Sequence, residues 1–407
     1  MVMSRSQSRL ADYIAMVIVF LMGIGAVMVF SAGANLGYEL DLKRFYDFPA
    51  LRQIVFFPLA VVGLLVASCI DYRWLRLRRR WWKSPAVWLV FVSIVLLGVV
   101  LIPQLGTEVN QARRWLRLTV GPVSISFQPS ELAKWAMVFG LAAVCAKSGP
   151  DARRYWTWFV PLCLLIGLVS GLIVVEDFGT AVFVALISFV ILIIAGVRWW
   201  HILTLLPFAG AGLVAGLIHS PHRIRRLLAF LRPEEWADIA YQANQSLIAI
   251  GSGGLVGKGL GEGVSKYGHL PEDTTDFIFA IVAEELGLIG TIGVIGLFVA
   301  FIGLGWMVVM RCHDRFGRLL AAGIVLTIGI QAAINIGVVT VVLPTKGIPL
   351  PFVSSGGTSM LLSAVAVGVL LNIASQTDRG DPNIPIAPDD ALDGGFGKAT
   401  NGEAAVE

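Results

Sequence analysis

Ten apolar stretches, each of about the length that crosses a lipid bilayer, constrain this chain more than any other feature. A hydrocarbon core about 30 Å thick takes roughly 20 residues of α-helix. With 57% hydrophobic and only 14% charged residues, the chain cannot be a soluble globular domain. Because lipid offers no partner to backbone N–H and C=O groups, and the alternation of a membrane barrel is absent, we expect an all-α polytopic membrane protein with about ten transmembrane helices. The stretches lie near 13–32, 54–70, 86–102, 131–147, 156–175, 178–196, 199–219, 286–310, 317–342 and 357–375.

Basic residues predict the orientation of these helices. Short loops rich in Lys and Arg stay on the cytoplasmic side, and the densest such loop is YRWLRLRRRWWK at 72–83. The parity of the helices then places both termini in the cytoplasm and leaves one long segment, 220–285, on the outer face between the seventh and eighth helices. In this interpretation residues 1–375 form a domain of the cytoplasmic (inner) membrane, and the acidic, Gly/Pro-rich residues 376–407 form a disordered cytoplasmic tail.

The outer segment contains the glycine-rich run GSGGLVGKGLGEG at 251–263. No phosphate-loop frame fits it and no strand precedes it, so a nucleotide site is not indicated. The glycines instead predict tight turns and a close approach of the backbone to a neighbouring helix or to a lipid headgroup.

Five carboxylates crowd the stretch HLPEDTTDFIFAIVAEELG at 269–287, in a chain that otherwise avoids charge. Two interpretations of Asp276 are open: a general base whose proton affinity is raised by partial burial, or the N-cap of a helix that starts at FIFA. Glu272 and Asp273 could hold a divalent cation, whereas Glu284 and Glu285 are expected to be structural partners at a helix entry.

Two charged residues lie within the predicted helix at 131–147. Glu131 and Lys134 are three residues apart and therefore share a helix face. One interpretation is a buried ion pair. The other is a cavity wall that opens toward the outer leaflet beside Arg113, Arg114 and Asp177, where the arginines would receive a phosphate better than lipid does.

Six stretches, taken together and in this order, resemble the SEDS family of shape, elongation, division and sporulation proteins. The resemblance runs from the first predicted helix to about residue 375. Within the family, the first and the last stretch are more similar to the division member than to the elongation member. The stretches are VNQARRW (109–115), FQPSELAKW (127–135), EDFGTA (176–181), YQANQSLIAIGSGGLVGKGLG (241–261), LPEDTTDFIFAIVAEELG (270–287) and PTKGIPLPFVSSGGTS (344–359).

The resemblance implies a peptidoglycan glycosyltransferase. Such an enzyme polymerises lipid II, a disaccharide pentapeptide carried on undecaprenyl diphosphate, into β1,4-linked glycan strands on the outer face of the membrane, here at the division septum. It places the family's essential aspartate at Asp276. The residues expected to bind the substrate are Arg113, Arg114, Trp115, Glu131, Lys134, Asp177 and Lys346.

The resemblance also implies partners. We expect a class B penicillin-binding transpeptidase such as FtsI, other membrane proteins of the division machinery and membrane lipid, but no nucleic acid. A divalent cation, magnesium or manganese, is a candidate cofactor, and no organic cofactor is expected.

Two other functions fit the same sequence. Ten helices with intramembrane charges and glycine-broken segments also describe a flippase or transporter of the same lipid, although no repeat between the two halves is evident. The third possibility is a non-catalytic scaffold that recruits a transpeptidase.

Overall fold

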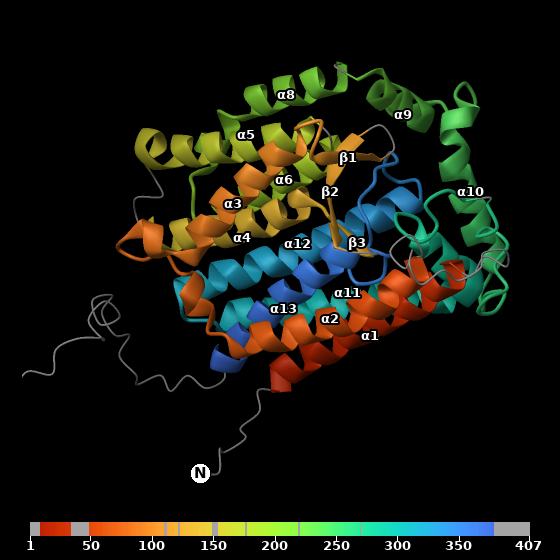
Figure 1. The fold of residues 1–407 in the computed structure, drawn as a ribbon, viewed down its shortest axis with the longest axis horizontal. Helices are drawn as coiled ribbons and strands as arrows, with labels where there is room; N and C mark the ends of the chain where they lie inside the picture. Colours follow the sequence, from red (N-terminus) through yellow and green to blue (C-terminus); the bar gives the residue numbers. More distant parts are fainter. Residues whose placement is uncertain are drawn as a thin grey trace, which may run out of the picture.

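A bundle of long helices makes up most of the molecule (Figure 1). The computed structural model describes residues 9–33, 49–109, 112–120, 123–148, 154–175, 177–218, 220–268 and 270–377. The helices are α1 (Arg9–Gly33), α2 (Pro49–Cys69), α3 (Pro85–Val100), α4 (Pro129–Ser148), α5 (Val160–Val174), α6 (Phe178–Ile194), α7 (Trp199–Leu203), α8 (Leu206–Ile218), α9 (Pro221–Leu231), α10 (Ala237–Gly253), α11 (Ile278–Arg311), α12 (Arg315–Val339) and α13 (Gly357–Thr377). Short helical turns are η2 (Tyr72–Leu75), η3 (Trp81–Lys83) and η5 (Tyr155–Phe159).

The predicted all-α membrane class is confirmed, since each of the ten apolar stretches coincides with a helix or with two consecutive helices. Within the described part of the chain, seven helical segments are long and apolar enough to span a membrane, and α3 and α6 are shorter apolar helices. The remaining stretch is α4, whose apolar run is interrupted by Glu131 and Lys134. Helices α4, α12 and α13 lie in the middle of the bundle, whereas α8 has no buried residue (Figure 1).

A three-stranded antiparallel sheet was not predicted. Strands β1 (Gly106–Val109), β2 (Ala112–Val120) and β3 (Val123–Phe127) are hydrogen-bonded in that order, with Leu116 opposite both Gly106 and Phe127. The strands are too short for their alternation to stand out beside apolar runs of spanning length. The sheet lies at one end of the bundle, and β2 carries the predicted substrate-binding residues Arg113, Arg114 and Trp115.

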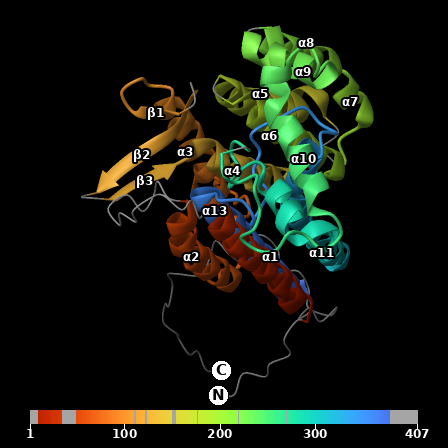
Figure 2. The same ribbon diagram turned by 90° about the vertical axis from the view of Figure 1, so that its right-hand side faces the viewer.

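The two ends of the bundle carry the two segments that were predicted to lie on opposite sides of the membrane. The turn that follows α2 lies at one end, where Tyr72 donates from its hydroxyl to Asp314, at the α11–α12 turn, over 3.1 Å. The sheet, α9 and α10 lie at the other end (Figure 1), and Figure 2 shows this end with the sheet on one side and α10 on the other. Which end faces the cytoplasm stays a prediction.

Helix α11 bends at Gly287, whose φ of 66° is a left-handed conformation that suits glycine. Residues before the bend belong to the end of the bundle that carries the sheet, and the predicted span 286–310 lies in the longer part after it. A Cβ at Gly287 would collide with the backbone of Leu255 and Gly257. The predicted close approach of the glycine-rich run to a neighbouring helix is thus confirmed. Of the predicted tail, residues 376–377 extend α13, and 378–407 lie outside the described residues.

Candidate active site

Asp276 lies in the loop that connects Leu270 to the start of α11. Its carbonyl oxygen accepts a hydrogen bond of 2.8 Å from Nδ2 of Asn335, a buried residue of α12. The same amide nitrogen donates to the carbonyl oxygen of Ile348, also over 2.8 Å. One amide group inside the bundle therefore holds together the loop of Asp276 and the segment that contains the PTKG turn.

This second segment, residues 344–356, lies against the loop of Asp276. The backbone N–H of Ser355 donates to the carbonyl of Thr274 (2.9 Å), and the hydroxyl of Ser354 donates to the carbonyl of Thr275 (2.6 Å). A Cβ added at Gly347 would lie 3.1 Å from Oδ2 of Asp276. The absence of a side chain at Gly347 thus keeps the space beside the carboxylate open.

The N-cap interpretation of Asp276 is not supported by this geometry. Helix α11 begins at Ile278, and its N-cap position belongs to Phe277, which makes no side-chain capping bond. The carboxylate of Asp276 therefore does not cap the helix. Of the two interpretations, the general base is the one that this geometry still allows.

The surroundings of Asp276 raise the affinity of its carboxylate for a proton. Burial raises its pKa to about 7, with help from the neighbouring carboxylates Glu272 and Asp177, while the positive charges of Arg114 and Arg226 act in the opposite direction. A general base works best when its pKa lies near the operating pH. Burial also raises the pKa of Asp273, to about 6.

Three of the predicted substrate-binding residues gather beside this loop. Asp177 accepts hydrogen bonds from the backbone and the hydroxyl of Thr180 at the start of α6 (3.1 and 2.8 Å), which fixes its position. Nη1 of Arg114 lies 3.7 Å from Oδ2 of Asp177. Nζ of Lys346 lies 5.6 Å from the centre of the Phe178 ring; burial lowers the pKa of Lys346, and the charge of Asp177 opposes this shift.

Arg113 joins this group through a small cavity of about 20 Å³. The cavity is lined by Arg113, Arg114 and Asp177 together with apolar residues of α3 and α5, among them Leu97 and Leu172. Cationic groups beside an apolar wall suit an anion attached to a lipid chain.

Glu131 and Lys134 lie elsewhere, inside the bundle. Nζ of Lys134 lies 2.7 Å from Oε2 of Glu131 and donates to Oε1 of Gln331 on α12 (2.9 Å), and Ser359 on α13 donates to the same Glu131 oxygen (2.9 Å). The side chains are only 2% (Lys134) and 8% (Glu131) exposed. The pair does not open toward the outer leaflet as expected, because α12 and α13 cover it, and the buried ion pair is the interpretation that fits. It connects to the PTKG segment through Gln331, whose amide donates to the carbonyl of Pro349 (2.9 Å).

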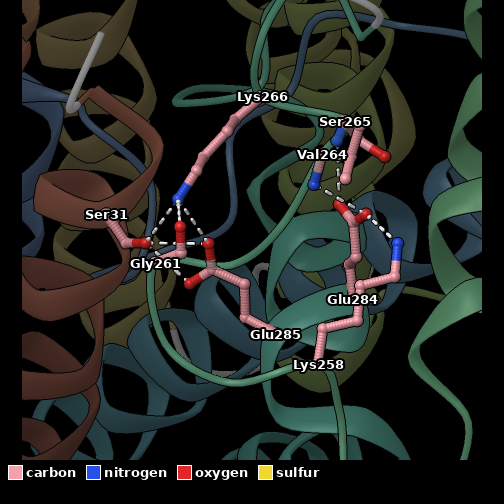
Figure 3. A network of polar contacts seen from close by, with 8 residues as sticks. All are labelled: Ser31, Lys258, Gly261, Val264, Ser265, Lys266, Glu284 and Glu285. Carbon is pink, nitrogen blue, oxygen red and sulfur yellow. Dashed lines mark hydrogen bonds and ion pairs between the residues drawn. The ribbon is translucent and has the colours of Figure 1, made fainter. Parts of the chain in front are cut away.

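Glu284 and Glu285 hold the glycine-rich run against α11, as predicted for structural partners (Figure 3). Glu284 pairs with Nζ of Lys258 (2.7 Å) and accepts from the backbone N–H groups of Val264 (3.0 Å) and Ser265 (3.1 Å). The carbonyl of Ser265 in turn accepts from the backbone N–H of Leu270 (2.9 Å). The start of the Asp276 loop is thereby tied to Glu284.

Glu285 forms the second half of this network (Figure 3). Its Oε1 lies 2.9 Å from Nζ of Lys266, and its Oε2 accepts from the hydroxyl of Ser31 on α1 over 2.6 Å. The side chains of Lys266 and Glu285 are 2% and 0% exposed. The network connects α1, the glycine-rich run and the bend of α11.

The carboxylates near Asp276 do not form a ready-made metal cage. Among the residues that the structure describes, no group of three or more His, Cys, Asp or Glu side chains is arranged to hold a metal ion. One oxygen of Glu272, which with Asp273 was a candidate ligand, accepts from the hydroxyl of Thr275 (2.7 Å). We therefore derive no step through magnesium or manganese.

The residues that position the site from a distance were not predicted from the sequence. Asn335 and Gln331 are polar residues within the apolar stretch 317–342, and an intramembrane polar residue is a signal of function or of a specific contact. Arg226 on α9, whose charge lowers the pKa of Asp276, was not among the predicted substrate-binding residues. Trp115 lies in β2 opposite Thr107, next to Arg114 in the sequence.

Comparison with known proteins gives consistent similarities. The family model described as "Cell cycle protein" (FTSW_RODA_SPOVE) matches residues 12–379. A relative from Trichlorobacter lovleyi named "Probable peptidoglycan glycosyltransferase FtsW" is 40% identical over 384 residues, which cover 91% of this chain and 95% of the relative.

Two solved structures share the fold. A chain from the structure described as "Structural coordination of polymerization and crosslinking by a peptidoglycan synthase complex" matches with a TM-score of 0.70 and 26% identity, over 90% of this chain and 98% of that chain. The rod shape determining protein RodA of Thermus thermophilus matches with a TM-score of 0.60 and 26% identity, over 89% and 95% of the two chains.

Proposed function

Because the chain belongs to the FtsW/RodA/SpoVE family of cell cycle proteins, the SEDS family, we propose that it polymerises lipid II with Asp276 as the general base. The chain is a peptidoglycan glycosyltransferase, like the relative named above. The observation that carries the assignment of Asp276 is its position: a carboxylate with a pKa of about 7 beside an arginine and an open glycine turn.

The reaction is a single displacement. The oxygen of the acceptor sugar's 4-hydroxyl attacks C1 of the lipid-linked donor, the bond between C1 and the diphosphate oxygen breaks, and the diphosphate leaves with the electron pair. Asp276 takes the hydroxyl proton. An α-linked diphosphate that becomes a β1,4 linkage is an inversion, which needs one base and no covalent sugar–enzyme intermediate.

The leaving diphosphate needs positive charge more than it needs an acid. Arg113, Arg114 and Lys346 would supply this charge, and Asp177 holds Arg114 in place through its contact of 3.7 Å. Fixed cations that meet a developing negative charge lower the barrier because they need no reorganisation during the reaction. Contact of Trp115 with the substrate is part of the proposal, whereas the buried pair of Glu131 and Lys134 would act only through Gln331, which binds the carbonyl of Pro349.

The setting of the reaction is also part of the proposal. We propose that the enzyme works at the division septum beside a crosslinking transpeptidase of class B, with both termini in the cytoplasm. The orientation can be tested by labelling single cysteines with a membrane-impermeant reagent in intact cells. Arg78→Cys should stay unlabelled and Glu262→Cys should react, since both positions are exposed; the reverse pattern would overturn the orientation.

Purified protein in sealed vesicles with labelled lipid II tests the function. A polymerase makes glycan strands, a flippase moves the lipid between leaflets without making strands, and a scaffold does neither. Strand formation that requires Asp276 supports the proposal, and lipid movement without strands would replace it by transport.

A further inference from the structure

A cavity of about 310 Å³ lies at the end of the bundle that carries the active site. Its walls come from Arg226 on α9, from Tyr241 and Gln242 on α10, and from Pro271 and Thr345 on the two loops around Asp276. The volume is at the lower end of the range of about 300–1,000 Å³ that is usual for ligand pockets. It suits one ring-sized group of a larger substrate.

The cavity is lined by one residue from each of the two loops that meet at Asp276, Pro271 and Thr345. Nε2 of Gln242 donates to the carbonyl of Pro271 over 3.0 Å, which ties α10 to the loop of Asp276. Thr345 is two residues before Gly347, whose backbone abuts the carboxylate of Asp276. The charge of Arg226 also reaches Asp276, since it lowers the pKa of that carboxyl.

The chemistry of the walls differs from that of the arginine cavity. Arg226 and His222 are accompanied by the carboxylate of Asp238, and Tyr241 presents a ring that is 43% exposed. A diphosphate would meet one arginine here, against two arginines beside Asp177 in the other cavity. A sugar ring can donate hydroxyl protons to Asp238, accept from Arg226 and lie against the face of Tyr241.

We propose that this cavity binds the terminal sugar of the acceptor and presents its hydroxyl to Asp276. The inference rests on the proposed polymerase function and assigns the donor and the acceptor to different binding sites. The guanidinium groups of Arg113 and Arg114 meet the lipid-linked diphosphate of the donor, and the polar cavity takes the acceptor sugar. One arginine from each cavity, Arg114 and Arg226, acts on the charge of Asp276.

Two substrates that can each play only one role separate the two cavities. A lipid II analogue with its 4-hydroxyl removed can only donate, and the disaccharide as a methyl glycoside can only accept. Tyr241→Ala and Asp238→Asn should each raise the KM for the acceptor by about tenfold, as expected for one lost contact, and should leave the KM for the donor within about twofold. Tyr241→Phe keeps the ring and should behave like the unmodified protein.

Arg232→Ala is the matched control, because Arg232 follows α9 but pairs with Glu235 at the surface; it should change neither KM. A donor KM that rises while the acceptor KM stays constant would make the cavity a diphosphate site, and two unchanged KM values would remove it from substrate binding. Either result overturns the proposal.

A binding measurement keeps the test independent of turnover. In the Asp276→Asn protein, saturation-transfer NMR should detect the methyl glycoside, and adding Tyr241→Ala should abolish the signal. If unmodified protein forms no glycosidic bond but this pattern holds, the cavity still binds the sugar and only the polymerase function fails. Equal signals with and without Tyr241 would refute the cavity as the sugar site.

Discussion

Glu285 and Asp276 are carboxylates nine residues apart in the chain, and the fold gives them opposite surroundings. Glu285 is fully buried, and both of its oxygens are occupied, by Lys266 and by Ser31. Asp276 is only partly buried, lies among further carboxylates as well as arginines, and has its pKa raised to about 7. A carboxylate whose partners neutralise it supports structure, whereas one that is crowded by like charge holds a reactive proton site. The comparison predicts that substitutions around Glu285 mainly lower stability and that substitution of Asp276 mainly lowers activity.

The largest effect should come from breaking the buried pair. Lys266→Ala leaves the charge of Glu285 without compensation and should lower the free energy of unfolding by about 3–5 kcal/mol, measured by thermal unfolding in detergent. Lys258→Ala is the matched control: its side chain is 32% exposed, and Glu284 keeps two backbone donors, so the loss should be about 1 kcal/mol or less. Equal losses for the two variants would contradict the structural difference between the pairs.

Lys134→Ala tests the same principle in the middle of the bundle. It removes the partner of Glu131 but leaves the hydrogen bond from Ser359 to the same carboxylate. The free energy of unfolding should therefore fall by about 3 kcal/mol, the lower end of the range for a broken buried pair. The variant should lose folded protein or affinity for lipid II, as seen by size-exclusion yield and a binding titration. A well-folded and fully active variant would show that the pair does not position the site.

Asp276→Asn should leave folding intact and lower polymerisation by about 100-fold or more, the scale of a lost general base. The amide keeps the shape of the side chain but cannot take the proton. Gel analysis of strands made from labelled lipid II measures the rate. Asp273→Asn is the neighbouring control and should have a milder effect; a near-normal rate for Asp276→Asn would move the search for the base to Glu272 or Asp273.

The last effect concerns pH and has opposite signs for rate and stability. The rate should rise with pH and level off above about 7, because Asp276 must lose its proton to act as a base. Stability should fall as pH rises from about 4 to about 7, because the folded state binds the proton more tightly than the unfolded state, in which an aspartate titrates near about 3.9. Asp276→Asn should remove both dependences. A rate that does not depend on pH between 5 and 8 would argue against this base.

The local sequence was sufficient to predict the membrane class, the helices and the motif that carries Asp276. These features depend on neighbours along the chain: a spanning helix needs only a run of apolar residues, because each backbone hydrogen bond closes within the segment. The essential role of Asp276 was implied by the resemblance of one continuous motif to the SEDS family, and the residues alone left the N-cap interpretation open.

The pairing of the charges was decided only by the tertiary structure. Glu285 binds Lys266, 19 residues away in the chain, and Ser31, 254 residues away. Asn335 on α12 binds the carbonyl of Asp276. The burial of Glu131 and Lys134 under α12 and α13, and the sheet that carries Arg114, were likewise invisible in the sequence. A carboxylate looks the same in a sequence whether packing brings it a lysine or another carboxylate, and that choice decides between a structural and a catalytic residue.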